Sequence, residues 1–245
     1  MDMKISGSGV VSSGEYDDII ISGSSKVNGD IRCKNMKVAG AISCMGNIEC
    51  LEQIYVSGSA SFKESISANH LKISGSVIVE KDCVVKKDFY TSGSIKSYGN
   101  IKAQELKSSG MIIVDGGVES EIIEISGAFH CKGLVNAENI KITFQKELCV
   151  NEIGGSSITI LPEEQFKLKK IHFPLFSKIY NESKNSVNKV NVIEGDTISV
   201  EGIEVEKIVG RIVSIGKNCK IGLVQYSENL EVDEDAKVEK YEKIL

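Results

Sequence analysis

The segments Ile54-Tyr-Val-Ser-Gly58-Ser-Ala-Ser-Phe62 and Leu71-Lys-Ile-Ser-Gly75-Ser-Val-Ile-Val79 are two copies of one pattern, and this pattern decides the fold. Between Ile19 and Ile142, a glycine that usually follows a serine recurs at an almost constant spacing. The repeated glycines are Gly23, Gly40, Gly58, Gly75, Gly93, Gly110 and Gly127. A fixed short period of this kind indicates one coil of chain that is repeated and stacked on itself, which is a solenoid.

Mostly apolar residues, with a few serines and one threonine, stand at six fixed offsets from each repeated glycine. The offsets are four and two residues before it, two and four residues after it, and eight and ten residues after it, so each coil has three short strands. Alternate strand residues share a side and equivalent residues stack from coil to coil, so these positions predict six inward-facing columns. The column eight residues after the glycine, for example, holds Ile31, Ile48, Ile66, Cys83, Ile101, Val118 and Val135.

Three strands and three turns per coil predict an all-β fold, a right-handed parallel β-helix of triangular section with about 17 residues per coil. Two coils are longer by one residue, and both place this extra residue after the third strand, which preserves the columns. Six residues after the repeated glycine, five coils carry a second glycine, at Gly29, Gly46, Gly99, Gly116 and Gly133. We expect a corner at this position whose backbone conformation glycine reaches at little cost.

The pattern changes along the chain and predicts three parts. Residues 1–161 form the main β-helix, with residues 1–18 as a partial first coil or cap. Residues 162–190 lack the repeat and read as a basic and aromatic insertion or linker. Residues 191–245 return to short alternating strands separated by glycine- or asparagine-containing corners, which predicts further β-helix coils. Their register against the main columns is left open by the sequence.

Composition excludes some classes of protein. A net charge of -5 over 245 residues argues against a nucleic-acid partner, because binding phosphates requires an excess of positive charge. The sequence begins without an apolar signal-peptide core, and no run approaches the roughly 20 apolar residues that span a bilayer. Seven cysteines without a C-x-x-C pair suit a reducing compartment. We therefore expect a cytoplasmic protein.

Few residues suggest catalysis or metal binding. The histidines His70, His130 and His172 are far apart in the repeat, whereas a zinc site needs three or four converging ligands. Gly7-Ser-Gly9 is a fragment of a phosphate-binding loop, but no third glycine or Lys-Ser/Thr follows, and a turn is the better interpretation. We predict no catalytic residue, no cofactor and no metal site.

Four carboxylates and two cysteines each allow both a functional and a structural interpretation. The carboxylates Asp17, Asp18, Asp115 and Glu119 could be taken as a pair for glycan cleavage, but we favour surface solvation. Cys33 and Cys50 occupy one column in adjacent coils, at a separation compatible with a disulfide. We favour small buried core residues for both.

The stretch from residue 166 to 180 is basic and aromatic, unlike the rest of the chain. Its apolar residues follow helical spacing, which suits an interfacial membrane helix or a partner-docking helix, although Pro174 interrupts it. The alternative is a loop or short helix that covers one face of the β-helix. The candidate membrane or partner contacts are Phe166, Lys167, Lys169, Lys170, Phe173, Phe176 and Lys178.

The motif Val27-Asn-Gly-Asp-Ile-Arg-Cys33, with Tyr98-Gly-Asn-Ile-Lys-Ala103 and the alternating Ile-Ser-Gly strands, resembles the bactofilins, which are bacterial polymer-forming cytoskeletal proteins. The resemblance covers about residues 5–142. The segment 215–232 looks like the second half of a longer, two-part subgroup. The resemblance implies a right-handed β-helix that polymerises end to end without nucleotide. It also implies scaffolds at the membrane that act in cell shape, envelope organisation or motility, with no catalytic residues.

The function that we expect is therefore a nonenzymatic cytoskeletal scaffold. Its end coils would pair with those of another subunit by strand addition and apolar contact, making a homopolymer. A membrane surface, particularly the inner face of the cell membrane, and envelope or motility proteins are the other expected partners, and nucleic acid is not. Two alternatives stay open: a β-helix carbohydrate-active or acyl-transfer enzyme, and a monomeric binding platform that uses residues 166–180.

Overall fold

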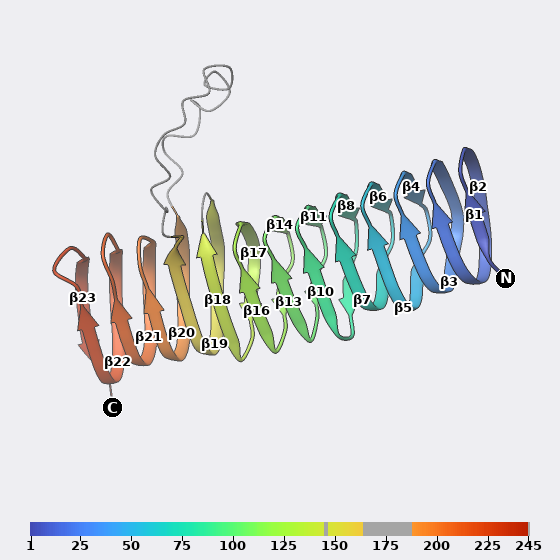
Figure 1. The fold of residues 1–245 in the computed structure, drawn as a ribbon. Coiled ribbons are helices and arrows are strands. Elements are labelled where there is room, and N and C mark those ends of the chain that lie inside the picture. The colour runs from blue at the N-terminus through green and yellow to red at the C-terminus, as the bar shows by residue number, and fades with distance from the viewer. Residues whose placement is uncertain (145–146, 164–187, 245) are drawn as a thin grey trace, which may run out of the picture.

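A computed structural model describes residues 1–144, 147–163 and 188–244. The described chain is an elongated stack of β-coils, with its N- and C-terminal coils at opposite ends of the stack (Figure 1). All of its regular elements are strands, and their pairings are parallel, for example β1 with β2 and β22 with β23. Within these described residues, no helix is long and apolar enough to cross a membrane.

The strands differ in length because some continue through a corner of the coil and others end at it. The first eight are β1 (Met3–Ile5), β2 (Ser8–Ile21), β3 (Ser24–Val38), β4 (Ala41–Cys44), β5 (Ile48–Val56), β6 (Ser59–Phe62), β7 (Ile66–Ile73) and β8 (Ser76–Val79). The next eight are β9 (Cys83–Val85), β10 (Asp88–Thr91), β11 (Ser94–Ser97), β12 (Ile101–Lys102), β13 (Glu105–Ser108), β14 (Met111–Val114), β15 (Val118–Glu119) and β16 (Ile122–Ile125). The last seven are β17 (Ala128–Asn136), β18 (Asn139–Phe144), β19 (Leu148–Pro162), β20 (Lys189–Val200), β21 (Glu204–Ile215), β22 (Lys220–Val232) and β23 (Lys237–Lys243).

Each internal strand pairs with the equivalent strands of the coils before and after it. Ile31 pairs with Ile48, and Ile48 with Ile66, so successive partners are separated by one coil of the repeat. These pairings confirm the predicted all-β parallel solenoid of about 17 residues per coil, and it has about 13 turns. The right-handed winding and the triangular section stay predictions.

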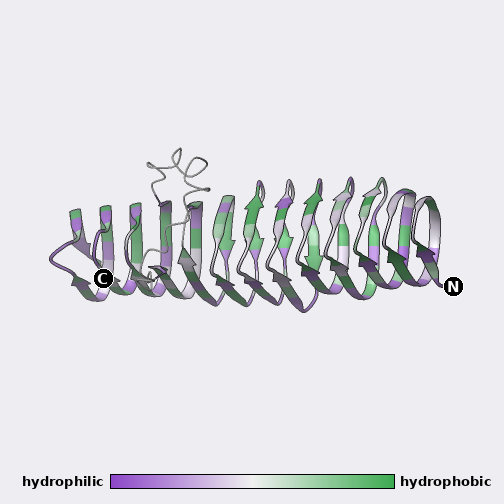
Figure 2. Ribbon diagram, turned by 45° about the horizontal axis from the view of Figure 1, so that its top comes forward, coloured by the Kyte–Doolittle hydropathy of each residue, from purple (hydrophilic) through white to green (hydrophobic). Residues whose placement is uncertain are grey.

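The six predicted columns form the core. Of the residues at these offsets in the seven clear repeats, all are buried except Ser120, which is half-buried. Figure 2 shows the resulting alternation of apolar and polar residues along the strands. Full burial of an aliphatic side chain contributes about 1.5–3 kcal/mol, so the stacked columns are the main source of stability.

The extra residue of each longer coil lies where the sequence placed it. In the first such coil, Cys33 and Asn35 pair with Cys50 and Gln53, so the additional residue follows Cys50. In the second, Ala68 pairs with Val85 and Leu71 with Phe89. Both insertions follow the third strand and leave the columns in register.

The glycines that stand six residues after the repeated glycine are needed for a different reason than we expected. Gly29 has a positive φ of 104°, but Gly46, Gly99, Gly116 and Gly133 are not among the positive-φ glycines of the described chain. At these four positions a Cβ atom would come within 3.0 Å of the backbone of a neighbouring coil. Glycine is needed at these corners because stacked backbones approach closely, and a special backbone conformation is required only at Gly29.

The strands on either side of residues 164–187 pair directly with each other. Val150 pairs with Val190 and Ile158 with Ile198, although this long stretch of chain intervenes, and both partners of each pair are buried. The C-terminal coils therefore continue the columns of the main solenoid, which answers the question of register that the sequence left open. In the sequence, residues 164–187 come between β19 and β20.

Candidate assembly surfaces

The N-terminal coil presents the start of the core columns. β1 pairs only with β2, so the other edge of β1 has no strand partner among the described residues. Met3 and Ile5 are half-buried, whereas their stacked equivalents Ile19 and Ile21 are 1% and 0% exposed. We call Met3, Ile5, Gly14 and Tyr16 the N-terminal end surface, whereas Val11 of the same coil is fully buried.

The C-terminal coil presents the other end of the same columns. β23 pairs only with β22, again leaving one edge without a strand partner in the described chain. Val232 is 44% exposed and Tyr241 is 65% exposed, although Ile215 and Val224, one coil earlier, are buried. We call Leu230, Val232, Ala236, Val238 and Tyr241 the C-terminal end surface.

Both end surfaces combine apolar side chains with free backbone hydrogen-bonding groups. An edge strand carries a row of N–H and C=O groups that a further strand can pair with. Solenoids need end coils that shield these edges, but here the described residues leave both edges uncovered. The arrangement can bind another β-structure by strand addition, with the apolar columns meeting across the junction.

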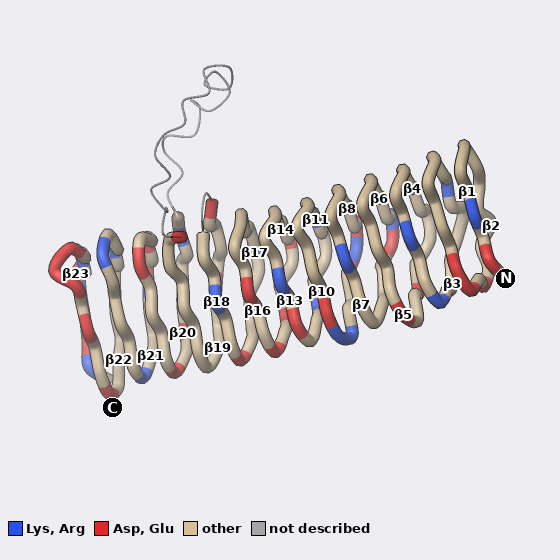
Figure 3. The backbone as a smooth tube through the Cα atoms, in the orientation of Figure 1, with Lys and Arg blue, Asp and Glu red and all other residues tan. Residues whose placement is uncertain are grey.

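Charged residues surround the C-terminal end surface. Asp233, Glu234 and Asp235 form the turn before β23, where Figure 3 shows acidic residues next to one another along the backbone. The strand β23 itself carries Lys237, Glu239, Lys240, Glu242 and Lys243. Charges on an edge strand limit indiscriminate pairing, so a partner must match this charge pattern as well as the apolar columns.

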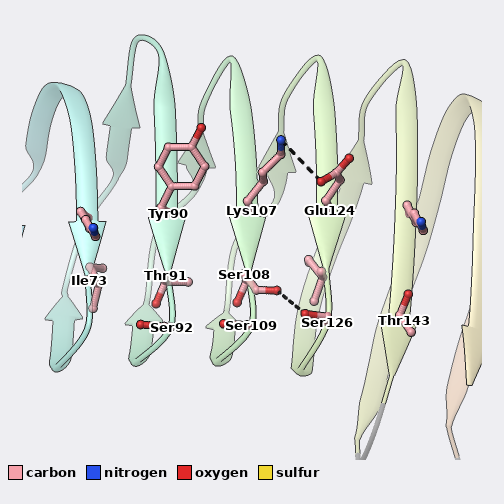
Figure 4. Close-up of a pocket in the computed structure, with 13 residues that line it drawn as sticks. Ile73, Tyr90, Thr91, Ser92, Lys107, Ser108, Ser109, Glu124, Ser126 and Thr143 are labelled. Carbon is pink, nitrogen blue, oxygen red and sulfur yellow. Dashed lines mark hydrogen bonds and ion pairs between the residues drawn. The ribbon is translucent and has the colours of Figure 1, made fainter. Parts of the chain in front are cut away.

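A shallow groove of about 440 Å³ lies on the face formed by β7, β10, β13, β16 and β18 (Figure 4). Tyr90, Lys107 and Glu124 come from successive strands of this face. The Tyr90 hydroxyl donates to Glu105 Oε2 at 3.1 Å, and Lys107 Nζ lies 2.6 Å from Glu105 Oε1 and 3.5 Å from Glu124 Oε2. The contacts of Tyr90 with Glu105 and of Lys107 with Glu124 tie adjacent coils together.

Glu105, which contacts the groove residues Tyr90 and Lys107, is not set up as an acid catalyst. The ammonium of Lys107 is the main cause that lowers the pKa of Glu105, with the Tyr90 hydroxyl contributing in the same direction. Glycosidases need one carboxyl group whose pKa is raised so that it can donate a proton. Glu105 is shifted in the opposite direction, so it is not a proton donor of this kind.

The histidines of the described chain each meet one carboxylate. His70 Nδ1 lies 2.8 Å from Asp88 Oδ2, and His130 Nε2 lies 3.2 Å from Glu147 Oε2. The two pairs are on different strands several coils apart. The described residues hold no group of three metal-ligating side chains, and His172 lies outside them.

The four candidate carboxylates do not converge. Asp17 pairs with the N-terminal amine and Asp18 accepts from Asn35 Nδ2 at 2.9 Å. Asp115 lies 2.7 Å from Lys132 Nζ, which lowers the pKa of its carboxyl group, and Glu119 lies 2.7 Å from Lys102 Nζ. Each makes its own local contact, so the structure does not bring them together as a catalytic pair.

Gly7-Ser-Gly9 lies at the corner between β1 and β2. The carbonyl oxygen of Gly7 accepts a hydrogen bond from Ser24 N at 3.0 Å, in the same way as the later corner glycines. The segment continues into a strand, so it does not present a helix N-terminus to a phosphate group.

Cys33 and Cys50 are paired residues of adjacent coils, and both are buried free thiols. Interaction with Cys50, followed by burial, raises the pKa of Cys33. Cys50 Sγ also donates to the carbonyl oxygen of Lys34 at 3.2 Å. The favoured interpretation as small core residues agrees with this burial.

The candidate contacts Phe166, Lys167, Lys169, Lys170, Phe173, Phe176 and Lys178 all lie outside the described residues. Sequence reasoning placed assembly at the ends of the rod but did not identify the residues of either end surface. The alternation in Leu230-Glu-Val232 was visible, but its column could not be assigned, because Phe144 and Pro162 replace the corner glycines that set the register.

Comparison with known proteins supports part of this picture. Residues 1–84 match the model of the Bactofilin family, described as polymer-forming cytoskeletal. The uncharacterized protein YhbF of Bacillus subtilis (strain 168) is 30% identical over 113 residues, which is 46% of this chain and 42% of that protein. The match thus spans less than half of each protein. No solved structure matches the chain.

Proposed function

The first 84 residues of this chain match the bactofilin family, a polymer-forming cytoskeletal group, and we propose that the protein is a nonenzymatic scaffold that self-assembles end to end into filaments. The resemblance seen in the sequence is confirmed over those residues. Membership of a longer two-part subgroup stays a prediction. The family description implies self-assembly, and the end-to-end mode is our own extension of it.

One observation carries the end-to-end mode. Columns that are buried throughout the solenoid become exposed at its C-terminal end, where Val232 and Tyr241 are 44% and 65% exposed, and Met3 and Ile5 at the N-terminal end are half-buried. Burying such side chains against a second subunit contributes about 1.5–3 kcal/mol each, before the cost of association is subtracted. Strand pairing across the junction would add hydrogen bonds that the end strands lack.

Two further features favour filaments that form without nucleotide and without catalysis. Gly7-Ser-Gly9 forms a strand corner and accepts an interstrand hydrogen bond, so it does not act as a phosphate-binding loop. Glu105, which contacts the groove residues Lys107 and Tyr90, has a lowered pKa and is engaged by both of them. These side chains stabilise the stacking of coils, which is the role that a scaffold requires.

Electron microscopy of the purified protein without nucleotide tests the proposal. We expect filaments whose length increases with protein concentration. Val232→Asp, on the C-terminal end surface, should abolish them because it places a charge in the junction. Val84→Asp is the matched control, since Val84 is 36% exposed on a lateral face and should leave filaments intact. Monodisperse particles at every salt and protein concentration would contradict end-to-end assembly.

We also propose that residues 166–178 contact a membrane surface, the inner face of the cell membrane being the expected one. The basic and aromatic composition of this stretch supports the proposal. Because β19 and β20 pair directly, the segment can be replaced by a short glycine-serine loop without removing a coil. Co-sedimentation with phosphatidylglycerol vesicles should be lost in that variant, and weak in both proteins with phosphatidylcholine. Undiminished binding by the loop variant would assign the contact elsewhere. Envelope or motility proteins are the further partners that this placement suggests.

A further inference from the structure

We propose that one lateral face of the solenoid binds a polyproline II segment of another protein, in which every third residue is acidic. The binding surface is a row of outward side chains, which we call the lysine–tyrosine ladder: Lys37, Tyr55, Lys72, Tyr90 and Lys107. Each of these residues is the direct strand partner of the next, so the row follows the long axis of the stack. The inference concerns a different surface from the end coils and does not depend on filament formation.

Lysine and tyrosine alternate along the ladder, so a lysine stands in every second coil. The Nζ atoms of Lys37 and Lys72 lie 5.9 and 5.8 Å from the centroid of the Tyr55 ring between them. Among the described residues, no carboxylate forms an ion pair with Lys37 or Lys72. Both lysines are exposed. The ladder therefore offers two available ammonium groups on either side of one aromatic ring.

The ladder runs along two shallow grooves. A groove of about 420 Å³ is lined by Lys37, Tyr55 and Lys72. Lys72 also lines the groove of about 440 Å³ described above, so the two grooves meet at this residue. In the second groove, Ser92 and Ser109 lie beside the ladder with exposed side chains (Figure 4). A polyproline II segment has no internal hydrogen bonds, so its carbonyl groups are free to accept from such hydroxyl groups.

The interval between the lysines distinguishes the possible peptide conformations. Neighbouring strands lie about 4.8 Å apart, so a lysine recurs about every 9.6 Å. In polyproline II every third residue returns to the same edge after about 9.3 Å. A β-strand returns a side chain to the same face after about 6.8 Å, and an α-helix brings back every seventh residue after about 10.5 Å. Polyproline II is the closest match, and flexible lysine side chains absorb the remaining difference.

The tyrosine rings between the lysines fit the same conformation. Proline-rich segments in polyproline II conformation dock on grooves lined by aromatic side chains. Tyr55 is half-buried and Tyr90 is 39% exposed, so both rings are accessible. Prolines between the acidic residues would lie against these rings while the carboxylates meet the lysines. The chain itself contains only two prolines, Pro162 and Pro174, so the segment belongs to another protein.

Carboxylates beside the ladder are engaged within the face. Asp88 Oδ2 lies 2.8 Å from His70 Nδ1, and Glu105 Oε1 lies 2.6 Å from Lys107 Nζ. Glu124 follows Lys107 in the same row, and its Oε2 lies 3.5 Å from Lys107 Nζ. Lys107 is thus the least available lysine of the ladder, and the negative charge of Glu124 opposes an acidic peptide at this end.

Fluorescence anisotropy of a fluorescein-labelled peptide of five Glu-Pro-Pro repeats, titrated with the full chain, tests the proposal. We expect saturable binding that weakens as the salt concentration rises. A peptide of the same composition, with all its glutamates in one block, should bind about fivefold more weakly, because its charges cannot meet successive lysines. Equal affinity for the two peptides, or no binding of the repeat peptide at low salt, would overturn the proposal.

Three variants locate the binding surface. Lys72→Gln should weaken binding of the repeat peptide about two- to fivefold, the effect typical of one exposed ion pair. Lys102→Gln is the matched control, because Lys102 lies in another outward column and pairs with Glu119 at 2.7 Å. Glu124→Gln should strengthen binding by about twofold, since it removes a repulsive charge and releases Lys107. The same affinity for Lys72→Gln and Lys102→Gln would show that the ladder is not the site.

A second ligand tests the class of partner. Polygalacturonate, an anionic polysaccharide, should compete with the repeat peptide only weakly. If it binds more tightly than the peptide and loses affinity in Lys72→Gln, the ladder binds a polysaccharide and the peptide assignment is wrong. Electron microscopy of Lys72→Gln should still show filaments, because the ladder is lateral. Loss of peptide binding would therefore leave end-to-end assembly standing, and a chain that binds the peptide without forming filaments would remove only the proposed function.

Discussion

The carbonyl oxygen of Gly58 lies so close to Gly75 that a Cβ atom on Gly75 would stand well inside 3.0 Å from it. The same oxygen accepts a hydrogen bond from Ser76 N at 2.9 Å. The corner glycine therefore lets the next coil come close enough to form this hydrogen bond. Gly75 does not have a positive φ, so the close approach explains the glycine without a special backbone conformation.

Gly75→Ala should lower the free energy of unfolding by at least about 2 kcal/mol, because the added methyl group forces two backbone segments apart. Urea unfolding followed by circular dichroism measures the change, in a Val232→Asp background that keeps assembly out of the measurement. Gly7→Ala is the matched control and should change the free energy by less than about 0.5 kcal/mol, since it meets nothing within the subunit. Equal losses for the two variants would refute the steric explanation.

Thr91→Val should stabilise the protein by about 1 kcal/mol. Thr91 is 4% exposed in a core column, and its Oγ1 is buried without a hydrogen-bond partner. Valine has nearly the same shape and removes the unpaired hydroxyl group. Ser97→Ala is the comparison, because Ser97 Oγ donates to the carbonyl oxygen of Lys81 at 3.2 Å and its loss should destabilise. Thermal unfolding should show shifts of opposite sign, and two downward shifts would rule out the prediction.

The ion pair of Glu105 predicts a pH-dependent contribution to stability. Lys107, and to a lesser extent Tyr90, lower the pKa of Glu105 below its ordinary value of 4.5. A lowered carboxyl pKa means that the stabilisation is present above about pH 4.5 and is lost as the pH falls through the lower folded-state pKa. Glu105→Gln should therefore reduce the urea midpoint at pH 7, and its midpoint should converge with that of the unmodified protein as the pH falls below 4.5. A constant difference between the two proteins across this range would show that the charge of Glu105 is not involved.

Thiol reactivity should follow burial. Among the described cysteines, Cys149 is exposed and the other six are buried. Burial raises the pKa of Cys83 to about 12 and that of Cys131 to about 11, so both thiols stay protonated near neutral pH. In the folded protein, we expect iodoacetamide to modify only one thiol per chain, Cys149, on the fast timescale. In urea, it should modify all seven thiols. Mass spectrometry after Cys149→Ser should show no fast modification; a second fast thiol would indicate local opening of a coil.

The sequence predicted the main solenoid in detail because its repeat is local. Each glycine sets the register for the coil that follows it, so Ile31, Ile101 and Val135 could be assigned to one buried column before any strand pairing was known. The purpose of the corner glycines was harder to predict. Gly46 and Gly133 were expected because glycine reaches an unusual backbone conformation at little cost. Instead, the close approach of the neighbouring coil's backbone explains them, and the sequence of one repeat does not reveal the distance between coils.

The candidate assembly site was predicted only as a location. We inferred from the repeat that the function lies at the ends of the rod, because internal coils bury one another. The residues of the C-terminal end surface could not be assigned, because Phe144 and Pro162 interrupt the glycine series and the stretch 164–187 separates β19 from β20.

By itself, the sequence determined the coil length, the six columns and the place of each extra residue, since hydrophobic alternation and glycine spacing are local properties. Only the tertiary structure decided that Val150 stacks on Val190 despite the long stretch between them, and hence that Gly14 and Tyr241 are the two ends of one column. The physical reason is that strands pair according to their positions in space. A register that is counted along the sequence is lost across a stretch that lacks the repeat.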